Sequence, residues 1–266
     1  MNSSPASGLA VAASGSGAVA EMHVGDGTRR NALPGRAWQR LAAQVEELGA
    51  APSLRVLVIR GEGDTFCAGS DMSDWADAGT GYVEESFAHM ERAFTAIEEC
   101  PVPVIAEIRG AAAGAGCQLA LACDLRLMAD SARIGMPIAR LGILASPAFA
   151  ARMVAVAGPA AARELLYTGR LVDARTAVAL GLADHIVAEA QLTAHVGRLA
   201  ADIAEHPPSA IRAAKLAVTA ALEPQRRATA VNPRPAVARP HFDRAIAAFL
   251  GRSPAAVPAP AGRRRL

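Results

Sequence analysis

Phe66-Cys67-Ala68-Gly69-Ser70-Asp71-Met72 and Gly110-Ala111-Ala112-Ala113-Gly114-Ala115-Gly116-Cys117-Gln118 are the two stretches that carry most of the functional information in this sequence. Each joins an apolar, strand-like run to the expected start of a helix, and each is rich in residues with little or no side chain. The first amides of a helix have no partner inside the helix, so such junctions present N–H groups to a ligand. Two amides from separate loops that point to one place would stabilise a carbonyl oxygen as it gains negative charge.

The composition indicates one large domain, or one domain with a helical appendage. Of the 266 residues, 52% are hydrophobic and only 4% are aromatic, so we expect a core of small aliphatic side chains and many helices. A net charge of +2 without an internal basic stripe does not favour a nucleic-acid partner. The one basic cluster, Arg263-Arg264-Arg265, follows the Pro- and Ala-rich segment 254–262, which is typical of a solvated tail.

The sequence also bears on compartment and metal content. No apolar run reaches membrane-spanning length, and no basic region precedes the N-terminal apolar stretch, so we predict neither a membrane segment nor a secretory signal. The spacing of Cys67, Cys100, Cys117 and Cys123 contains no C-x-x-C pair and no disulfide-dense pattern. Reduced thiols, a cytoplasmic location and no metal site are the predictions that follow.

Periodicity predicts strands and helices that alternate in the first part of the chain. A hairpin is expected over Leu9–Val24, with its turn at Ser14–Gly17, followed by helices and buried strands. The predicted helices are Leu33–Leu48, Tyr82–Glu99 and Ala115–Cys123, and the predicted strands are Leu54–Arg60, Val104–Ile108, Leu125–Ala129 and Ala132–Gly135. This alternation indicates an α/β core.

Beyond about Ser146 the sequence predicts helices alone. They are Pro159–Tyr167, Asp173–Leu180, Ala190–Glu205, Ser209–Ala221 and His241–Leu250, with a loop over Glu223–Pro240. We therefore expect a core over residues 1–195, a helical C-terminal region over 196–253 and a disordered tail over 254–266.

Four segments carry a resemblance to a known family. They are Arg30-Asn31-Ala32-Leu33, Phe66–Met72, Pro103–Cys123 and Leu165–Leu182. In order and spacing they resemble the R-N-A-L, F-x-A-G-x-D-L, P-V-I-A…G-x-G-C-x-L-A-L-A-C and L-x-x-T-G…G-L motifs of the crotonase superfamily, the enoyl-CoA hydratase/isomerase group. The match extends from about Leu9 to Arg252, and an ordered set of motifs is more specific than any one alone.

The resemblance implies a spiral of repeated ββα units, a homotrimer or homohexamer, and acyl-CoA or enoyl-CoA thioesters as substrates. It implies no prosthetic group, because coenzyme A enters as part of the substrate. The two N–H donors for the thioester oxygen would be those of Ala68 and Ala115, where a larger side chain would crowd the ligand. Ala115 stands where Gly is more usual in the family, which matters little because the donor is a backbone group.

Relatives that hydrate enoyl thioesters use carboxylates for proton transfer, and here the resemblance fails. The first family acid corresponds to Gln118, the second to Ile138, and a third, used by some isomerase and dehalogenase relatives, to Ser146. A side-chain amide orients water but does not accept and return a proton as a carboxylate does. Hydration by the family's usual mechanism therefore does not follow from this sequence.

Several ionisable residues are candidates to replace the missing acids. His89 lies on a helix that lines the acyl pocket in relatives, although an exposed or half-buried histidine without a catalytic role is the simpler interpretation. Asp71 precedes a helix and is typical of an N-cap. Glu107 interrupts a buried strand, where an ion pair with Arg109 is more plausible than chemistry. Asp124 follows a helix end and indicates a structural role.

The resemblance also suggests which residues contact coenzyme A. Arg30 and the backbone of Ala32 match positions that hold its phosphates and adenine, and a guanidinium suits phosphate. The last helix, with Phe242, Phe249 and Arg252, is similar to one that often completes the site of a neighbouring subunit. The full predicted set is Arg30, Ala32, Ala68, Gly69, Ser70, Asp71, Met72, Ala115, Phe249 and Arg252.

Three functional hypotheses remain open. The first is an enoyl-CoA hydratase/isomerase-type enzyme with a backbone oxyanion hole and unusual acid/base groups. The second is a protein that binds acyl-CoA but has lost turnover. The third is a nucleotide-binding α/β protein, suggested by Gly110–Gly116, but its G-x-x-x-G-x-G spacing differs from G-x-G-x-x-G. The sequence does not specify the acyl group.

Overall fold

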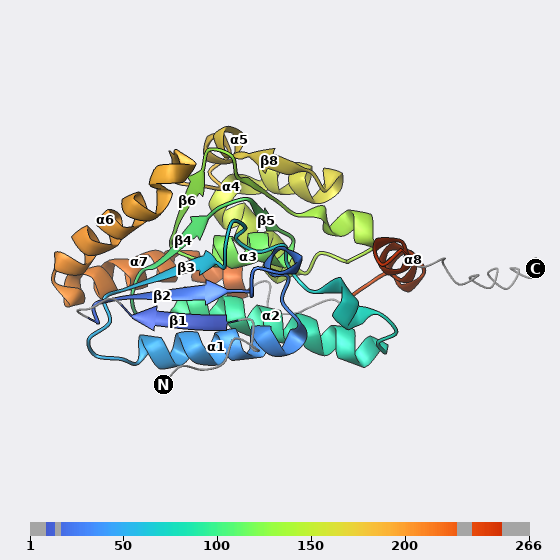
Figure 1. Ribbon diagram of the computed structural model, residues 1–266, viewed down its shortest axis with the longest axis horizontal. Coiled ribbons are helices and arrows are strands. Elements are labelled where there is room, and N and C mark those ends of the chain that lie inside the picture. The colour runs from blue at the N-terminus through green and yellow to red at the C-terminus, as the bar shows by residue number, and fades with distance from the viewer. Residues whose placement is uncertain (1–8, 14–16, 228–235, 252–266) are drawn as a thin grey trace, which may run out of the picture.

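The apolar runs predicted as strands form the middle of a six-stranded sheet. The computed structural model describes residues 9–13, 17–227 and 236–251 and has a mixed α/β fold (Figure 1). The strand order is β1-β2-β3-β4-β6-β9, with β1 antiparallel to β2 and all other neighbours parallel. These strands are β1 (Leu9–Ala13), β2 (Val19–Val24), β3 (Val56–Gly61), β4 (Val104–Ile108), β6 (Leu125–Ala129) and β9 (His185–Val187).

A second, three-stranded sheet forms beside the stretches 66–72 and 110–118. It has the order β5-β7-β8, with β5 (Ala111–Ala113) parallel to β7 (Arg133–Gly135) and β7 antiparallel to β8 (Leu171–Asp173). β5 follows β4 after only two residues, so the stretch 110–118 continues the chain directly from a strand of the main sheet. The chain therefore turns from one sheet to the other at the candidate site.

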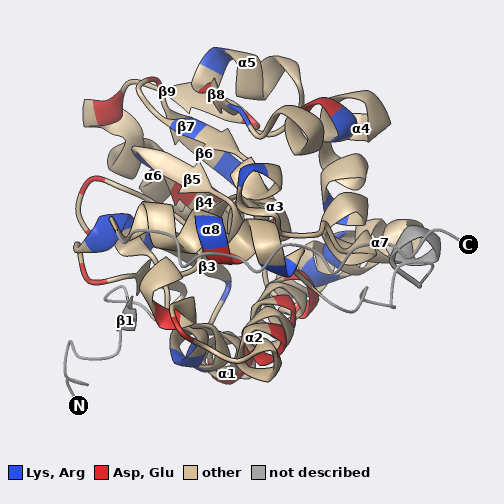
Figure 2. Ribbon diagram, turned by 90° about the vertical axis from the view of Figure 1, so that its right-hand side faces the viewer, with Lys and Arg blue, Asp and Glu red and all other residues tan. Residues whose placement is uncertain are grey.

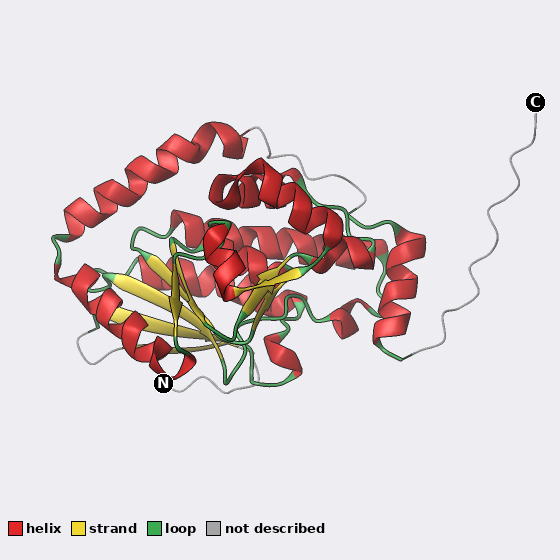
Figure 3. Cartoon of the chain, turned by 90° about the horizontal axis from the view of Figure 1, so that it is seen from above, coloured by secondary structure: helices red, strands yellow, loops and turns green. Residues whose placement is uncertain are grey.

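Helices cover the main sheet and extend beyond the small one (Figures 1 and 3). They are α1 (Gly35–Gly49), α2 (Thr80–Glu99), α3 (Ala115–Ala122), α4 (Pro147–Thr168), α5 (Ala174–Ala179), α6 (Leu192–Glu205), α7 (Pro208–Arg227) and α8 (Arg239–Phe249). α1 packs along α2, α3 lies between α2 and α4, and α6 packs on β3 and β4. Short 3-10 helices η2 (Arg29–Asn31), η3 (Met72–Trp75), η4 (Pro137–Leu141) and η5 (Glu189–Gln191) connect these elements.

The pattern of burial explains why the sequence predicted the central strands and helices. Every side chain of β4 is buried, and α1 buries Trp38, Leu41 and Val45 at helical spacing while its other face is exposed. The predicted hairpin, the buried strands and the helices before Cys123 are confirmed, with shifts of one or two residues at most ends. The expected hairpin turn at 14–16 lies outside the described residues.

The C-terminal part contains strands as well as helices, so the prediction of helices alone after Ser146 is wrong. β8 and β9 are only three residues long, too short for alternation to be visible in the sequence. α4 begins already at Pro147 and passes a kink at Gly158, whose φ of 75° permits the break before Pro159. The loop predicted over 223–240 is also partly wrong, because α7 runs to Arg227 and α8 begins at Arg239.

Charged residues occur on many elements of the chain, and several acidic residues lie along α2 (Figure 2). Within the described residues, none of the helices has the length and apolar character needed to cross a membrane. In the same part of the chain, no group of three His, Cys, Asp or Glu side chains is placed to bind a metal ion. The predicted tail at 254–266 lies outside the described residues.

Candidate active site

The stretches 66–72 and 110–118 lie side by side in the structure. The amide of Cys67 donates to the carbonyl oxygen of Ala111 at 3.0 Å, and the amide of Ala113 donates to that of Cys67 at 3.0 Å. A methyl group on Gly116 would overlap the carbonyl group of Cys67, so only glycine allows the start of α3 to pack here. The first stretch therefore runs along β5 and reaches the beginning of α3.

The side chain of Asn31 holds the first stretch in place from the other side. Asn31 is buried, and its Nδ2 donates to the carbonyl oxygens of Glu62 at 2.8 Å and Thr65 at 2.6 Å, while its Oδ1 accepts from the amide of Gly27 at 2.9 Å. Its φ of 56° lies in the left-handed region, which asparagine tolerates better than most residues. The sequence contained Asn31 in a recognised motif but did not indicate this structural role.

The predicted donor at Ala68 is wrong. Its amide donates to the carbonyl oxygen of Arg30 at 2.9 Å, so this N–H is already used inside the fold. Two residues later, Ser70 pairs with Leu33 in a parallel bridge, in which Leu33 exchanges hydrogen bonds with Gly69 and Asp71. In such a bridge the N–H of Ser70 itself points away from Leu33. Among the described residues it meets no acceptor.

The second predicted donor, Ala115, is compatible with the structure and stays a prediction. Its amide is the first of α3, and no described residue accepts a hydrogen bond from it. A methyl group built on Gly69 would lie 3.1 Å from this nitrogen, so the loop that carries Ser70 borders the start of α3. Ser70 and Ala115 therefore supply a pair of unbonded amides on adjacent loops.

The three residues that the resemblance places at family acid positions carry no charge, and each side chain is engaged in the fold. Gln118 is fully buried, with Oε1 bound to Arg152 at 2.9 Å and Nε2 to the carbonyl oxygen of Phe149 at 3.3 Å. Ile138 is buried in η4. Ser146 is the N-cap of α4, and its hydroxyl accepts from the amide of Phe149 at 3.1 Å.

The partner of Gln118, Arg152, was missed by sequence reasoning. It forms ion pairs with Glu98 at 2.7 Å and Glu91 at 2.8 Å, both on α2. Burial by itself would lower the pKa of Arg152, but the carboxylates of Glu98 and Glu91 outweigh burial and raise it. A lone arginine in the apolar segment 147–157 was a signal that could have pointed to a buried ion pair.

The proposed replacement acids have structural partners. Asp71 is the N-cap of η3 and pairs with Arg29 at 2.5 Å, as its position before a helix predicted. Glu107 pairs with Arg109 at 3.4 Å, which confirms the predicted ion pair. Asp124 accepts from the amide of Val104 at 2.7 Å, as its predicted structural role requires. His89 is half-buried, with its ring 4.0 Å from Glu85.

Aromatic rings link α1 to the last helix. Their ring centroids are 5.5–6.3 Å apart, and the connected order is Trp38, Phe94, Phe149, Phe87, Trp75 and Phe242. Phe242 on α8 is only 1% exposed and packs on Trp75 of its own chain. α8 is further held by the hydrogen bond from the amide of Ala238 to the carbonyl oxygen of Gly142 at 2.8 Å.

Some of the residues predicted to contact coenzyme A lie close together, and others lie on separate elements. Arg30 is exposed with a φ of 55°, and its carbonyl group rather than its side chain anchors the first stretch. Ala32 follows directly, and Met72 is buried at the start of η3. Phe249 is 67% exposed on α8, and Arg252 lies outside the described residues.

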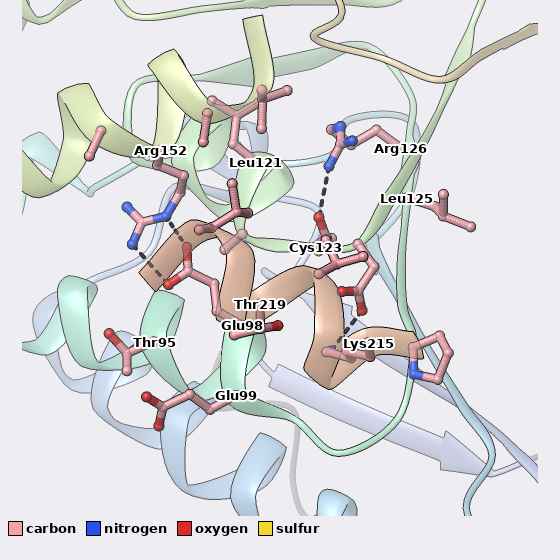
Figure 4. Close-up of a pocket in the computed structure, with 18 of the residues that line it drawn as sticks. Thr95, Glu98, Glu99, Leu121, Cys123, Leu125, Arg126, Arg152, Lys215 and Thr219 are labelled. Carbon is pink, nitrogen blue, oxygen red and sulfur yellow. Dashed lines mark hydrogen bonds and ion pairs between the residues drawn. The ribbon is translucent and has the colours of Figure 1, made fainter. Parts of the chain in front are cut away.

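A cavity of about 780 Å³ lies behind α3, between α2, α4 and α7 (Figure 4). Its walls are mainly aliphatic, and two ion pairs, Arg152–Glu98 and Lys215–Asp124, lie at its sides. Ser70, Ala115 and Gln118 do not line it. The unbonded amides and this cavity are therefore separate features, with Arg152 between Gln118 and the cavity.

Comparison with known proteins identifies relatives over most of the chain. The sequence profile of the family described as enoyl-CoA hydratase/isomerase matches residues 14–244. The Bacillus subtilis protein YngF, provisionally named an enoyl-CoA hydratase/isomerase, is 35% identical over 73% of this chain and 75% of its own. Mouse mitochondrial methylglutaconyl-CoA hydratase is 33% identical over 73% of this chain and 63% of its own.

Solved structures agree with the fold. An enoyl-CoA hydratase from Mycobacterium avium subsp. paratuberculosis superimposes with a TM-score of 0.81 and 25% identity, covering 94% of this chain and 98% of its own. A protein from Thermobifida fusca, provisionally named an enoyl-CoA hydratase and solved in complex with CoA, gives 0.72 and 32%, covering 84% and 92%. The α/β fold expected from the sequence resemblance is thereby confirmed.

Proposed function

Because the chain belongs to the enoyl-CoA hydratase/isomerase family of the crotonase superfamily, we propose that it binds an acyl-CoA or enoyl-CoA thioester between the two quoted stretches. The thioester oxygen accepts hydrogen bonds from the amides of Ser70 and Ala115, which stabilise the negative charge that develops on it. The observation that carries this proposal is that both amides lack an acceptor on loops that border each other. The relative solved with CoA supports a CoA ester as the ligand class.

The reaction we propose is an enzymatic one that proceeds through this oxyanion. Gln118, Ile138 and Ser146 offer no carboxylate, so proton transfer falls to water, to groups of the substrate, or to another residue such as His89. An oxyanion hole retains part of the catalytic power by itself, since removal of one donor typically costs about a hundred- to a thousandfold in rate.

A second candidate is an acyl-CoA-binding protein without turnover. The bonding of Gln118 favours it, because both ends of that side-chain amide are bound within the protein. Both candidates predict the same ligand and differ only in chemistry.

For the rest of the ligand we propose that Arg30 and the backbone of Ala32 bind the nucleotide part of CoA. The guanidinium of Arg30 is exposed beside the first stretch and has no ion-pair partner among the described residues. We also propose a homotrimer or homohexamer. Its support in the structure is the exposure of Leu216 and Val218 on α7, which leaves apolar surface uncovered in the single chain.

Isothermal titration calorimetry tests the ligand class directly. We expect butyryl-CoA and crotonyl-CoA to bind with Kd values on the order of micromolar, and butyryl-pantetheine to bind more weakly because it lacks the nucleotide. The absence of binding by any acyl-CoA would refute both candidates. Turnover of crotonyl-CoA, or exchange of α-protons of butyryl-CoA with deuterated water, then distinguishes the enzyme from the binding protein.

A further inference from the structure

The guanidinium of Arg152 occupies the point where α4 meets α2 and α3. It is 7% exposed, and three of its nitrogens have separate partners. Nη1 donates to Oε1 of Gln118 at 2.9 Å, Nε to Glu98 at 2.7 Å and Nη2 to Glu91 at 2.8 Å. Its Cζ lies 5.1 Å from the ring centroid of Phe94, which adds a cation–π contact.

These bonds determine how the amide of Gln118 is turned. A guanidinium only donates hydrogen bonds, so the oxygen of Gln118 must face Arg152. The NH₂ group then faces the other way, toward the carbonyl oxygen of Phe149 at 3.3 Å and the sulfur of Met136 at 3.7 Å. Each end of the side chain therefore has a protein partner.

Gln118 also lies close to one of the two unbonded amides along the chain. It is three residues after Ala115, so the two residues share a face of α3 about one turn apart. Its side chain leans toward the N-terminal end of the helix, as helical side chains do. A proton-transfer group at position 118 would therefore stand beside the oxyanion donor at Ala115.

From this geometry we infer that Arg152 is a positioning residue that holds the side chain at position 118 away from proton transfer. The inference rests on the proposed function, because it concerns the acid/base capacity of the same site. A glutamate at 118 would meet Arg152 at the place where the amide oxygen now lies. One carboxylate oxygen would be bound to the guanidinium and the other would face the carbonyl oxygen of Phe149, so neither would be directed at the reacting carbon. General acid/base catalysis needs a group within hydrogen-bond reach of the proton that it transfers.

The charges around Arg152 explain why an amide suits this position. With Gln118, one guanidinium faces two carboxylates, a net charge of −1. A glutamate at 118 would make the balance −2 in a largely buried place, which is unfavourable because like charges repel strongly at low dielectric. A neutral side chain at position 118 therefore suits the charges around Arg152. We expect that Gln118→Glu alone does not restore proton transfer at this position.

The test uses four proteins and one proton-transfer step. They are the parent, Gln118→Glu, the neutral background Arg152→Met/Glu91→Gln/Glu98→Gln, and Gln118→Glu in that background. Methionine fills the buried stem of Arg152 without its charge, and the two glutamines remove the carboxylates that it would leave unpaired. The step is exchange of the α-protons of butyryl-CoA in deuterated water: the carboxylate removes a proton, the enolate oxygen is held by the two amides, and a deuteron returns to the same carbon.

We expect the glutamate to raise the exchange rate at least about tenfold in the neutral background, as general base catalysis contributes about 10²–10⁴-fold, and to leave it nearly unchanged beside Arg152. An equal rise in both backgrounds, or no rise in the neutral one, would overturn the inference. Glu99→Gln is the matched control, since Glu99 is on the same helix and lines the same cavity without bonding Arg152.

A thermodynamic cycle covers the case in which the neutral background does not fold. Arg152→Lys keeps the charge but loses the planar fork that bonds both Gln118 and the glutamates. We expect Gln118→Leu to raise the unfolding equilibrium constant at least about fivefold more in the parent than in the Arg152→Lys background, and additive effects would overturn the inference. Failure of the parent to bind acyl-CoA would instead refute the proposed function, and the cycle would still report on the pairing.

Discussion

The amide nitrogen of Ala68 lies 2.9 Å from the carbonyl oxygen of Arg30, and this bond occupies the N–H group that the sequence had assigned to a ligand. It ties the stretch to the turn at Arg29–Asn31, where three consecutive residues have positive φ values. The amide of Ala68 is bound to this turn and the amide of Asp71 is bound to Leu33. The amide of Ser70 points to the opposite side and has no acceptor among the described residues.

Replacing single backbone amides by esters tests this assignment. An ester at Ser70, introduced as the α-hydroxy analogue of serine, removes an N–H that has no acceptor in the fold. Because the ester carbonyl of Gly69 accepts more weakly from the amide of Leu33, we expect a small loss of stability. We expect acyl-CoA binding to weaken about fivefold or more, the worth of one hydrogen bond. Thermal unfolding and calorimetry measure both quantities.

The ester at Ala68 is the matched control with the opposite expectation. It removes a bonded amide and should lower the free energy of unfolding by about 1 kcal/mol or more while the ligand affinity of the remaining folded protein stays the same. Weaker binding from the Ala68 ester, with none from the Ser70 ester, would return the donor role to Ala68.

Asn31 should contribute more to stability than its place in a surface turn suggests. Asn31→Asp keeps an acceptor for the amide of Gly27 but cannot donate to the carbonyl oxygens of Glu62 and Thr65. We expect a loss of about 2–4 kcal/mol in urea unfolding, since two buried acceptors lose their donor and a buried charge is added. Asn31→Gly separates the backbone from the side chain, because it relieves the positive φ but still removes the donors. A loss below 0.5 kcal/mol for both variants would contradict the role of this side chain.

Two phenylalanines on α8 provide a matched pair. Phe242 is buried against Trp75, whereas Phe249 is 67% exposed. Phe242→Ala should destabilise the protein by about 3–5 kcal/mol or release α8, and Phe249→Ala should change stability by less than about 0.5 kcal/mol. Thermal unfolding and hydrogen exchange of residues 239–249 measure the effect. Equal effects would mean that α8 does not dock as described, and weaker acyl-CoA binding in Phe249→Ala alone would support the predicted contact with CoA.

The chain contains a single lysine, Lys215, and its amine reports on the docking of α7. Nζ lies 2.7 Å from Oδ2 of Asp124 and 2.9 Å from the carbonyl oxygen of Val102, and the side chain is 8% exposed. We expect amine-reactive reagents to modify Lys215 at least about tenfold more slowly in the native protein than in urea, because modification requires local opening. Asp124→Asn should accelerate the native reaction. Equally fast labelling of the native and unfolded protein, read by peptide mass spectrometry, would show that α7 is not held by this bond.

The four cysteines should be unreactive until the protein unfolds. Burial raises the pKa of the Cys67 and Cys117 thiols from 9.0 to about 12, and it also raises the pKa of Cys100 and Cys123. A disulfide reagent at pH 8 should therefore titrate all four thiols in urea and none rapidly in the native state.

The same shifts give a pH dependence with a definite sign. Above pH 9 the unfolded chain releases thiol protons that the native protein keeps, so the contribution of Cys67 and Cys117 to stability is complete below pH 9 and is lost as the pH rises toward about 12. Urea unfolding at pH 8 and pH 10 should show the decrease, and replacement of both cysteines by alanine should reduce it. An unchanged slope in that variant would assign the decrease to other groups.

The amino-acid sequence determined the class of the protein and predicted where its site would lie. Buried runs such as Val104–Ile108 and the amphipathic spacing of α1 are local patterns, and they predicted elements that the structure contains. The stretches 66–72 and 110–118 predicted two loops that would supply unbonded amides, although the donor assigned to Ala68 was wrong. The resemblance predicted that Gln118, Ile138 and Ser146 stand at the family's acid positions.

Only the tertiary structure decided which groups remain free to act. Whether an amide has an acceptor depends on a segment distant in the chain, as Ala68 and Arg30 illustrate, and no local pattern encodes that pairing. The contact between Gln118 and Arg152 arises in the same way, because α3 and α4 are brought together by packing rather than by sequence. The three-residue strands β8 and β9 likewise exist only because the neighbouring strands β7 and β6 offer them hydrogen bonds.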